Sequence, residues 1–189
     1  MQASKKGVLK CLNLRGKISL FDQLLLEESL LRTSNSNYLI MNSHIKSNII
    51  LGRGNKLDEN VHNLQAKQDN IPIIRRFTGG GTVFTDENTQ YISLIINTDS
   101  LSHIPNYPVP IMKYTGELYE KILNINDDSN EVQFTLNEND YCLNHLKFAG
   151  NAQAITKQRW IHHTSLLWLY NIDKMNLYLP FPPKSPKYR

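Results

Sequence analysis

The sequence predicts one α+β domain over residues 1–189, a mixed β-sheet flanked by helices. Short apolar runs of strand length alternate along the chain with segments whose apolar residues recur at helical spacing. A chain of 189 residues is long enough to bury one hydrophobic core and gives no strong case for two. No apolar run approaches the roughly 18 residues that a membrane-spanning helix requires, so no contact with a membrane is expected.

The first quarter of the chain predicts a strand, a helix and a pair of strands. Residues 8–13 form an apolar run typical of a strand. Ser19 and Asp22 have the spacing of a helix cap, and the leucines after them predict a helix to about residue 32. After a polar loop, two short apolar runs at 38–41 and 48–51 are expected to form a strand pair.

The middle of the chain predicts two helices and a buried strand. The polar segment 57–67 has Val61 and Leu64 as its apolar positions, which predicts one short surface helix. Residues 91–96 are typical of a buried strand, and a proline-containing loop follows. The next helix is expected to end near Leu123, with four apolar residues at helical spacing: Ile111, Tyr114, Leu118 and Ile122.

The last third predicts strands and a tail. An acidic, asparagine-rich loop is expected at 124–131, and a turn near Lys157 and Gln158. The prolines at the C-terminus predict an extended tail over about 178–189. The strands expected here are 132–136, 141–148, 152–155 and 159–168.

A run of three glycines, within RRFTGGGTVFTD at 75–86, is the strongest functional signal. It lies between two apolar runs, which predicts a strand, a glycine turn and a second strand. Consecutive glycines let a ligand approach the backbone, and their N–H groups can form a concavity that suits an anion. Arg75 and Arg76 add positive charge at its edge. The alternative is a merely tight hairpin.

The run does not match the commoner nucleotide motifs. A phosphate loop of the G-x-x-x-x-G-K-[ST] type needs a lysine that is absent here. The G-x-G-x-x-G spacing also fails, because Phe84 stands where the last glycine should be.

Charge and cysteine usage limit the compartment and the partners. The formal net charge of +4 fits an acidic ligand, but no dense basic stripe with aromatics indicates nucleic acid. Cys11 and Cys142 are the only cysteines, and no N-glycosylation acceptor occurs, so secretion is not expected. The expected compartment is the cytoplasm or a mitochondrial or plastid matrix. The basic residues before Asp22 could suggest organelle targeting, although strand-like sequence begins near Val8.

A second cluster begins at Lys147, in the segment KFAGNA, which we interpret as strand, turn and strand. A lone lysine is usually a solvated side chain. His162 and His163 follow in RWIHHTSLL, and adjacent residues of a strand point to opposite faces. They could not easily share one metal ion, so a zinc site is not expected.

The glycine run, Asn139 with Asp140, the lysine segment and the paired histidines resemble, in order and spacing, the lipoate-protein ligase family of the biotin/lipoate ligase superfamily. The resemblance covers roughly residues 8–167. It implies the catalytic-domain fold of the class II aminoacyl-tRNA synthetase/biotin synthetase type. Such ligases react lipoate or octanoate with ATP to give acyl-adenylate and pyrophosphate. They then transfer the acyl group to a lysine of a lipoyl domain.

The resemblance also implies roles for individual residues. Lys147 would be catalytic, reaching both the phosphate and the acyl carbonyl, where negative charge builds up. Asp140 would help hold Mg²⁺. The acyl chain needs an apolar slot, and the strand residues Val83 and Phe148 are candidates for its walls. The residues that would bind ATP and lipoyl-adenylate are Arg76, Thr78, Gly79, Gly80, Gly81, Thr82, Val83, Asn139, Asp140, Lys147, Gly150, Ala152 and His163.

The sequence departs from the family pattern at three points. Thr85 stands where the family often has histidine, and Thr164-Ser165 where many members have Gly-Thr. The bacterial-type ligases carry a C-terminal accessory domain for which this sequence has no room. The partners that the resemblance implies are apo lipoyl domains of oxoacid dehydrogenase complexes, the glycine-cleavage H protein and a separate accessory-domain protein.

Three alternatives to an ATP-dependent ligase remain at this point. One is an ATP-independent octanoyl or lipoyl transferase that works through a thioester, for which Cys142 is the candidate nucleophile. Another is a non-catalytic binder of acyl groups or acyl-adenylate. The third is a biotin ligase, since the fold is shared.

Overall fold

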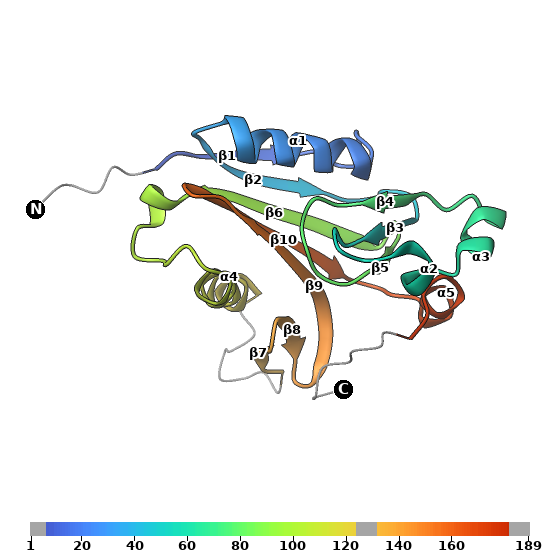
Figure 1. Cartoon of the computed structure of the whole chain (residues 1–189). Helices are drawn as coiled ribbons and strands as arrows, with labels where there is room; N and C mark the ends of the chain where they lie inside the picture. The colour runs from blue at the N-terminus through green and yellow to red at the C-terminus, as the bar shows by residue number, and fades with distance from the viewer. Residues whose placement is uncertain (1–6, 124–131, 182–189) are drawn as a thin grey trace, which may run out of the picture.

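The structure, a computed structural model that describes residues 7–123 and 132–181, contains a seven-stranded and a three-stranded sheet with helices on both sides (Figure 1). The large sheet has the order β1-β2-β6-β10-β9-β8-β7; β1 and β2 are parallel and its other pairs antiparallel. The expected mixed sheet and α+β class are confirmed. The large-sheet strands are β1 (Leu9–Asn13), β2 (Asn37–Asn42), β6 (Thr89–Asn97), β7 (Phe134–Asn137), β8 (Asp140–Leu143), β9 (Leu146–Ile155) and β10 (Arg159–Leu167).

The small sheet has the order β4-β3-β5, with β3 parallel to β4 and antiparallel to β5. Its strands are β3 (Asn48–Leu51), β4 (Ile73–Arg75) and β5 (Val83–Thr85). The expected pairing of 38–41 with 48–51 is therefore wrong: these runs are strands of two different sheets. The helices are α1 (Leu20–Thr33), α2 (Leu57–Asn60), α3 (Asn63–Gln68), the 3₁₀ helix η1 (Thr98–Leu101), α4 (Pro108–Leu123) and α5 (Ile172–Tyr178).

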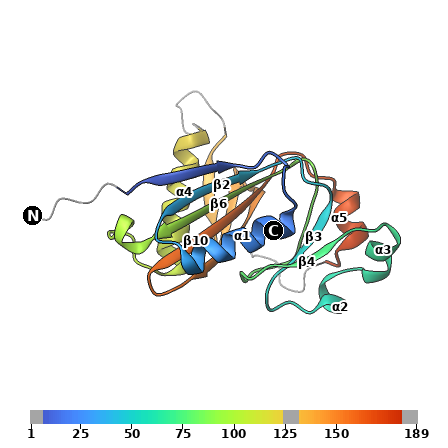
Figure 2. The ribbon, with the colours of Figure 1, turned by 90° about the horizontal axis from the view of Figure 1, so that it is seen from above.

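Helix α1 lies over one face of the large sheet, beside the small sheet (Figures 1 and 2). Its start was predicted correctly: the Ser19 hydroxyl accepts a hydrogen bond from the backbone N–H of Asp22. Leu20 and Leu24 pack towards the small sheet, while Leu31 packs on strands of the large one. The buried stripe of this helix thus joins the two sheets.

Helix α4 covers the opposite face of the large sheet (Figure 1). It begins at Pro108, inside the stretch expected to be loop, because a proline in the first helical turn needs no N–H partner. Its most buried residues include Ile111, Met112 and Tyr119. Ile122, expected on the inner face, is exposed, so the buried stripe lies partly on other positions than predicted.

The segment 57–67 is two short helices, which corrects the expectation of one. Val61 separates them with an extended backbone, at φ −142° and ψ 135°. Val61 is buried as expected, but Leu64 is exposed and Ala66 is buried in its place. Packing of this segment on α5 and β5, through the cluster that includes Phe84 and Tyr178, selects the buried positions.

Two expectations for the last third are also wrong. Residues 141–148 contain the end of β8, a turn at Asn144 with positive φ, and the start of β9. The segment from Lys147 to Ala152 is continuous strand within β9, and contains no turn. The tail was expected to be extended from about 178, but Tyr178 is the last residue of α5, a helix the sequence did not reveal.

The expected loop at 124–131 and the tail at 182–189 lie outside the described residues. Within the part that is described, no helix combines the length and apolar character needed to cross a membrane.

Candidate functional site

The glycine loop joins β4 to β5 across the position of β3. Because both strands pair with β3 and not with each other, the alternative of a tight hairpin is wrong. Gly80 has φ +99°, a conformation that residues with a Cβ rarely adopt. At Gly52, a Cβ would lie 2.1 Å from the carbonyl oxygen of Gly80. Only glycine at position 52 allows the two loops to approach this closely.

Two neighbouring arginines hold two adjacent loops, the glycine loop and the loop at 52–55. Arg76 is buried, and its Nη2 donates to the carbonyl oxygens of Gly79 (2.7 Å) and Gly81 (2.9 Å). Burial lowers the pKa of Arg76 to about 10, so it stays charged at neutral pH. Nη1 of Arg75 donates to carbonyls of the neighbouring loop, among them that of Asn55 at 2.7 Å. Both side chains shape the loops, and the charge of Arg76 lies directly behind the glycines.

The outer side of the glycine loop is open. Gly79 and Gly81 are exposed, with no atom within 4 Å of where a Cβ would lie. Beside them, the Oγ1 atom of Thr78 is buried without a hydrogen-bond partner. Thr82 accepts a hydrogen bond from Nδ2 of Asn55 at 3.1 Å. The loop therefore combines a fixed backbone with room for a ligand against its amides.

Val83 and Phe148, the two expected channel walls, lie in different parts of the core. Val83 packs against the cluster that includes Leu20 of α1. Phe148 packs against the cluster on the α4 side of the large sheet, 6.2 Å from the ring of Phe134. The structure does not bring these two side chains together.

Lys147 and Asp140 form an ion pair at the β8–β9 hairpin. The Nζ atom of Lys147 lies 2.6 Å from Oδ1 of Asp140, and their side chains are 28% and 13% exposed. Asn139, at the turn before β8, accepts a hydrogen bond through its carbonyl from Nδ2 of Asn151 (3.1 Å). The pair is partly shielded from water, which strengthens its attraction.

Strand β9 connects this ion pair to the glycine loop. The carbonyl oxygen of Asn151 lies 3.8 Å from where a Cβ of Gly80 would be. Asn151 is four residues beyond Lys147 on the same strand, or about 13 Å at the rise of a β-strand. Segments about seventy residues apart in sequence therefore meet along one strand.

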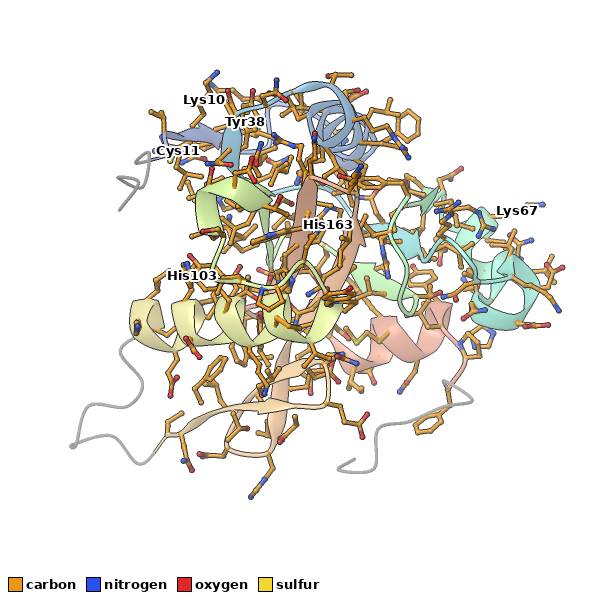
Figure 3. The ribbon with its side chains drawn as sticks, turned by 60° about the vertical axis from the view of Figure 1, so that its left-hand side comes forward. Lys10, Cys11, Tyr38, Lys67, His103 and His163 are labelled. Carbon is orange, nitrogen blue, oxygen red and sulfur yellow. The ribbon has the colours of Figure 1, made fainter. Side chains whose placement is uncertain are left out.

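His163 lies between the glycine loop and α1 (Figure 3). Its Nε2 is 2.9 Å from Oε2 of Glu27, within ion-pair distance. Its ring meets that of Phe77, in the glycine-loop segment, edge to face at 5.5 Å between centroids. Ala152 is the residue opposite His163 in the β9–β10 register. His163, a residue of β10, thus contacts both α1 and the glycine-loop segment.

Gly150 pairs with Ser165 of β10 and lies two residues before Ala152 on β9. Its carbonyl accepts a hydrogen bond from the Ser165 hydroxyl at 3.3 Å. Gly150 and Ala152 therefore form the part of β9 that lies between Lys147 and the histidine.

Glu27 was not identified from the sequence. It is 1% exposed, and its Oε1 accepts a hydrogen bond from Nε2 of Gln23 at 2.7 Å. Burial raises its pKa, but the electrostatic attraction of His163 and hydrogen bonds with His163, Ser93 and Gln23 outweigh burial and lower it. The available signal was the spacing of Gln23 and Glu27 on the leucine stripe of α1.

His162 points to the other face, as the alternation along a strand predicts. Its Nδ1 lies 3.1 Å from Nε2 of Gln153, and its Nε2 lies 3.1 Å from the hydroxyl of Tyr141. An amide nitrogen only donates, so Nδ1 accepts and Nε2 carries the proton. The Tyr141 hydroxyl then donates to Oγ1 of Thr115 on α4 at 2.6 Å. Burial lowers the pKa of His162 to about 3, so this chain of hydrogen bonds is uncharged.

The residues present fit a magnesium ion held mainly by phosphate oxygens. Among the described residues, no group of three histidine, cysteine or acidic side chains could hold a metal. Asp140 offers one carboxylate beside Lys147, and Mg²⁺ is usually bound through one or two carboxylates, substrate phosphates and water. Cys142, the candidate thioester nucleophile, is completely buried, which argues against that alternative.

Comparisons with known proteins find relatives and structural neighbours among the lipoate-protein ligases. The inactive lipoate–protein ligase 2 of Plasmodium falciparum is 30% identical over 224 residues, covering 92% of this chain and 58% of that protein. A crystal structure of lipoate-protein ligase A bound with ATP superimposes with a TM-score of 0.74 at 22% identity, covering 94% and 72% of the two chains. A bi-partite lipoate protein ligase of Thermoplasma acidophilum gives 0.72 at 20% identity, covering 95% and 68%.

The two structural likenesses identify the fold as that of the lipoate-protein ligases. Residues 19–189 match the family described as the lipoyl protein ligase A/B catalytic domain. The chain therefore belongs to that family. It spans a little over half the length of its Plasmodium relative.

Proposed function

We propose that this chain is the catalytic unit of an ATP-dependent lipoate-protein ligase. It joins lipoate or octanoate to AMP with release of pyrophosphate, and passes the acyl group to a lysine of a lipoyl-carrier domain. The acceptors would be lipoyl domains of oxoacid dehydrogenase complexes or the glycine-cleavage H protein. The observation that carries the proposal is the Lys147–Asp140 pair on the strand that contacts the glycine loop, in a chain of this family.

Both steps of this reaction require fixed hydrogen-bond donors at the atoms where negative charge develops. Charge builds on the α-phosphate in the first step and on the acyl oxygen in the second. The ammonium of Lys147, partly shielded and held by Asp140, would serve both positions. The open amides of Gly79 and Gly81, with Arg76 behind them, would hold the adenylate. Mg²⁺, held by phosphate oxygens and Asp140, would neutralise the pyrophosphate.

The test is incubation with lipoate, Mg-ATP and an apo lipoyl domain, followed by mass spectrometry of the acceptor. We expect a lipoyl mass increment on one acceptor lysine, and Lys147→Ala to lower the rate about 10²- to 10³-fold. Lys157→Ala is the matched control, because Lys157 is exposed in the β9–β10 turn, at the end of β9 beyond the candidate site. A Lys147→Ala variant with the wild-type rate would remove Lys147 from the mechanism.

A second arm supplies preformed lipoyl-adenylate in place of lipoate and ATP. It separates acyl transfer from adenylation, which matters because one relative is named an inactive ligase and another is bi-partite. Transfer without adenylation would limit the chain to the second step and indicate a separate accessory protein. Binding of lipoyl-adenylate with no turnover in either arm would decide for a non-catalytic binder.

A further inference from the structure

A buried arginine with unused hydrogen-bond donors lies at the end of β10 that is remote from the candidate site. Arg159 is 5% exposed, and its Nη2 donates to the carbonyl oxygen of Ser36 at 2.6 Å. Its Nε and Nη1 atoms are buried and have no hydrogen-bond partner. A guanidinium has five N–H donors in a planar fork, and buried donors without partners are costly. This group therefore calls for an explanation.

The arginine is also not neutralised by an acid. Among the described residues, no aspartate or glutamate lies within ion-pair distance of Arg159. Burial lowers its pKa from the ordinary value, as expected of a cation in a poorly solvated place. A buried charge without a partner is unfavourable, and an anion that meets the unused donors would relieve both deficits.

The neighbours of Arg159 are cationic or carry hydroxyls. Nζ of Lys10, on the edge strand β1, lies 5.6 Å from the ring centroid of Tyr38 (Figure 3). The Tyr38 hydroxyl is 2.9 Å from Oγ of Ser34. The Ser34 hydrogen bond, that of Ser36, and the charges of Lys10 and Arg159 lower the pKa of Tyr38 against the effect of burial. Two cations and these hydroxyls thus surround one tyrosine.

This cluster is separate from the candidate ligase site. Arg159 is four residues before His163 on β10, about 13 Å along the strand. The side chains between the two on this face include Ile161 of β10 and Leu31 of α1, which belong to one packed core cluster. A ligand at the glycine loop would not reach the unused donors of Arg159.

We propose that Arg159, Lys10 and the Tyr38 hydroxyl form a second binding site, specific for a phosphate group, either free or at the end of a small molecule. The unused N–H groups of Arg159 can donate charge-assisted hydrogen bonds to phosphate oxygens, and Lys10 adds a second charge. The bound group would link β1, β2 and β10 at one end of the large sheet. The inference does not depend on the proposed ligase function.

The experiment titrates orthophosphate, and in a second arm glycerol phosphate, into the whole chain at constant ionic strength. Heat of binding and the Tm are both recorded. We expect saturable binding with a dissociation constant on the order of 1 mM or tighter, and a Tm that rises with ligand concentration. Binding in both arms indicates a site for terminal phosphate groups. Binding of orthophosphate alone indicates a site for the free ion.

Variants locate the site. Lys10→Gln removes an exposed charge, and Arg159→Lys keeps a charge but loses the Nε and Nη1 donors. Each should weaken binding about 10-fold or more, because hydrogen bonds to charged groups are lost. Lys17→Gln removes another exposed lysine and is the charge-matched control. Lys147→Ala, which removes the cation of the candidate ligase site, should leave phosphate binding here unchanged.

If Arg159→Lys does not fold, Lys10→Gln carries the test. Absence of saturable binding at 10 mM, roughly tenfold above the expected constant, would overturn the proposal. Binding that is equal in Lys10→Gln and wild type, or that disappears in Lys147→Ala, would overturn it as well.

Discussion

The two adjacent histidines of β10 lie in opposite kinds of environment. His162 faces α4, in a chain of uncharged hydrogen bonds that includes Tyr141 and Thr115. His163 faces α1, beside the buried carboxylate of Glu27 and against Phe77 of the glycine-loop segment. One residue type, at consecutive positions, belongs to an uncharged core network on one face and contacts a buried carboxylate on the other.

The difference shows that the partners of a histidine, more than its position in a motif, decide what it can do. His162 has neutral partners and almost no water, so its protonation is suppressed. His163 has a carboxylate partner, Glu27, whose pKa it helps to lower against the effect of burial. Only the second arrangement places an imidazole–carboxylate pair next to the glycine-loop segment. Three substitutions, one on the α1 face and two on the α4 face, test this difference between the two histidine environments.

The largest effect is expected from Glu27→Ala on the charged face. Removing one member of a buried ion pair leaves the other group without compensation, so we expect a loss of about 3–5 kcal/mol in the free energy of unfolding. Urea unfolding measures it. Glu28→Ala is the control, because Glu28 pairs with Arg32 at 2.6 Å on the exposed side of α1 and should cost less than about 1 kcal/mol. Equal losses in both variants would contradict the importance of the buried pair.

The second largest effect is expected from His162, which should make the stability of the folded chain depend on pH. The folded pKa of His162, about 3, lies below its ordinary 6.5, so below pH 6.5 the unfolded chain takes up a proton that the folded chain does not. Stability should therefore fall as pH drops from 6.5, by about 1.4 kcal/mol per unit. His162→Gln should remove this slope between pH 6.5 and 4.5.

Glu27 affects the stability of the fold at lower pH than His162 does. Its folded pKa is lowered from 4.5, so its contribution is present above pH 4.5 and is lost as pH falls through the folded value. Urea midpoints measured from pH 7 to 4 distinguish the two groups. A slope above pH 4.5 that is unchanged in His162→Gln would show that His162 is not responsible for it.

The smallest effect is expected from Tyr141→Phe. The change leaves the hydroxyl of Thr115 and Nε2 of His162 short of one partner in the core, which should cost about 1–3 kcal/mol. Tyr107→Phe, at an exposed position, should be close to neutral and serves as the control. If the two substitutions cost the same in thermal unfolding, the hydrogen-bond chain does not stabilise the α4 face.

Much of the fold was predictable because it follows from local patterns. The cap at Ser19, the strand at 91–96 and the strand after the turn at Lys157 were placed within a few residues. The errors occur where packing overrides such patterns. Leu64 is exposed and α5 was missed, because both depend on contacts of short helices with the small sheet and with each other.

The candidate site was predicted in part. The alternation of a strand correctly separated His162 from His163, and the glycine loop approaches β9 at Asn151, four residues beyond Lys147. The partners of Arg76, Lys147 and His163 were not predictable, because each comes from a distant segment or from the loop's own carbonyls. The part of Lys147 in catalysis stays a prediction.

The sequence by itself determined the family, the mixed sheet with its flanking helices, and the two motifs that carry the candidate chemistry. Local spacing and residue type are enough for these. Only the tertiary structure decided that β4 and β5 both pair with β3, that Glu27 faces His163, and that two donors of Arg159 remain unused. Such facts depend on which segments are neighbours in space, and the burial and charge of a side chain are set by those neighbours.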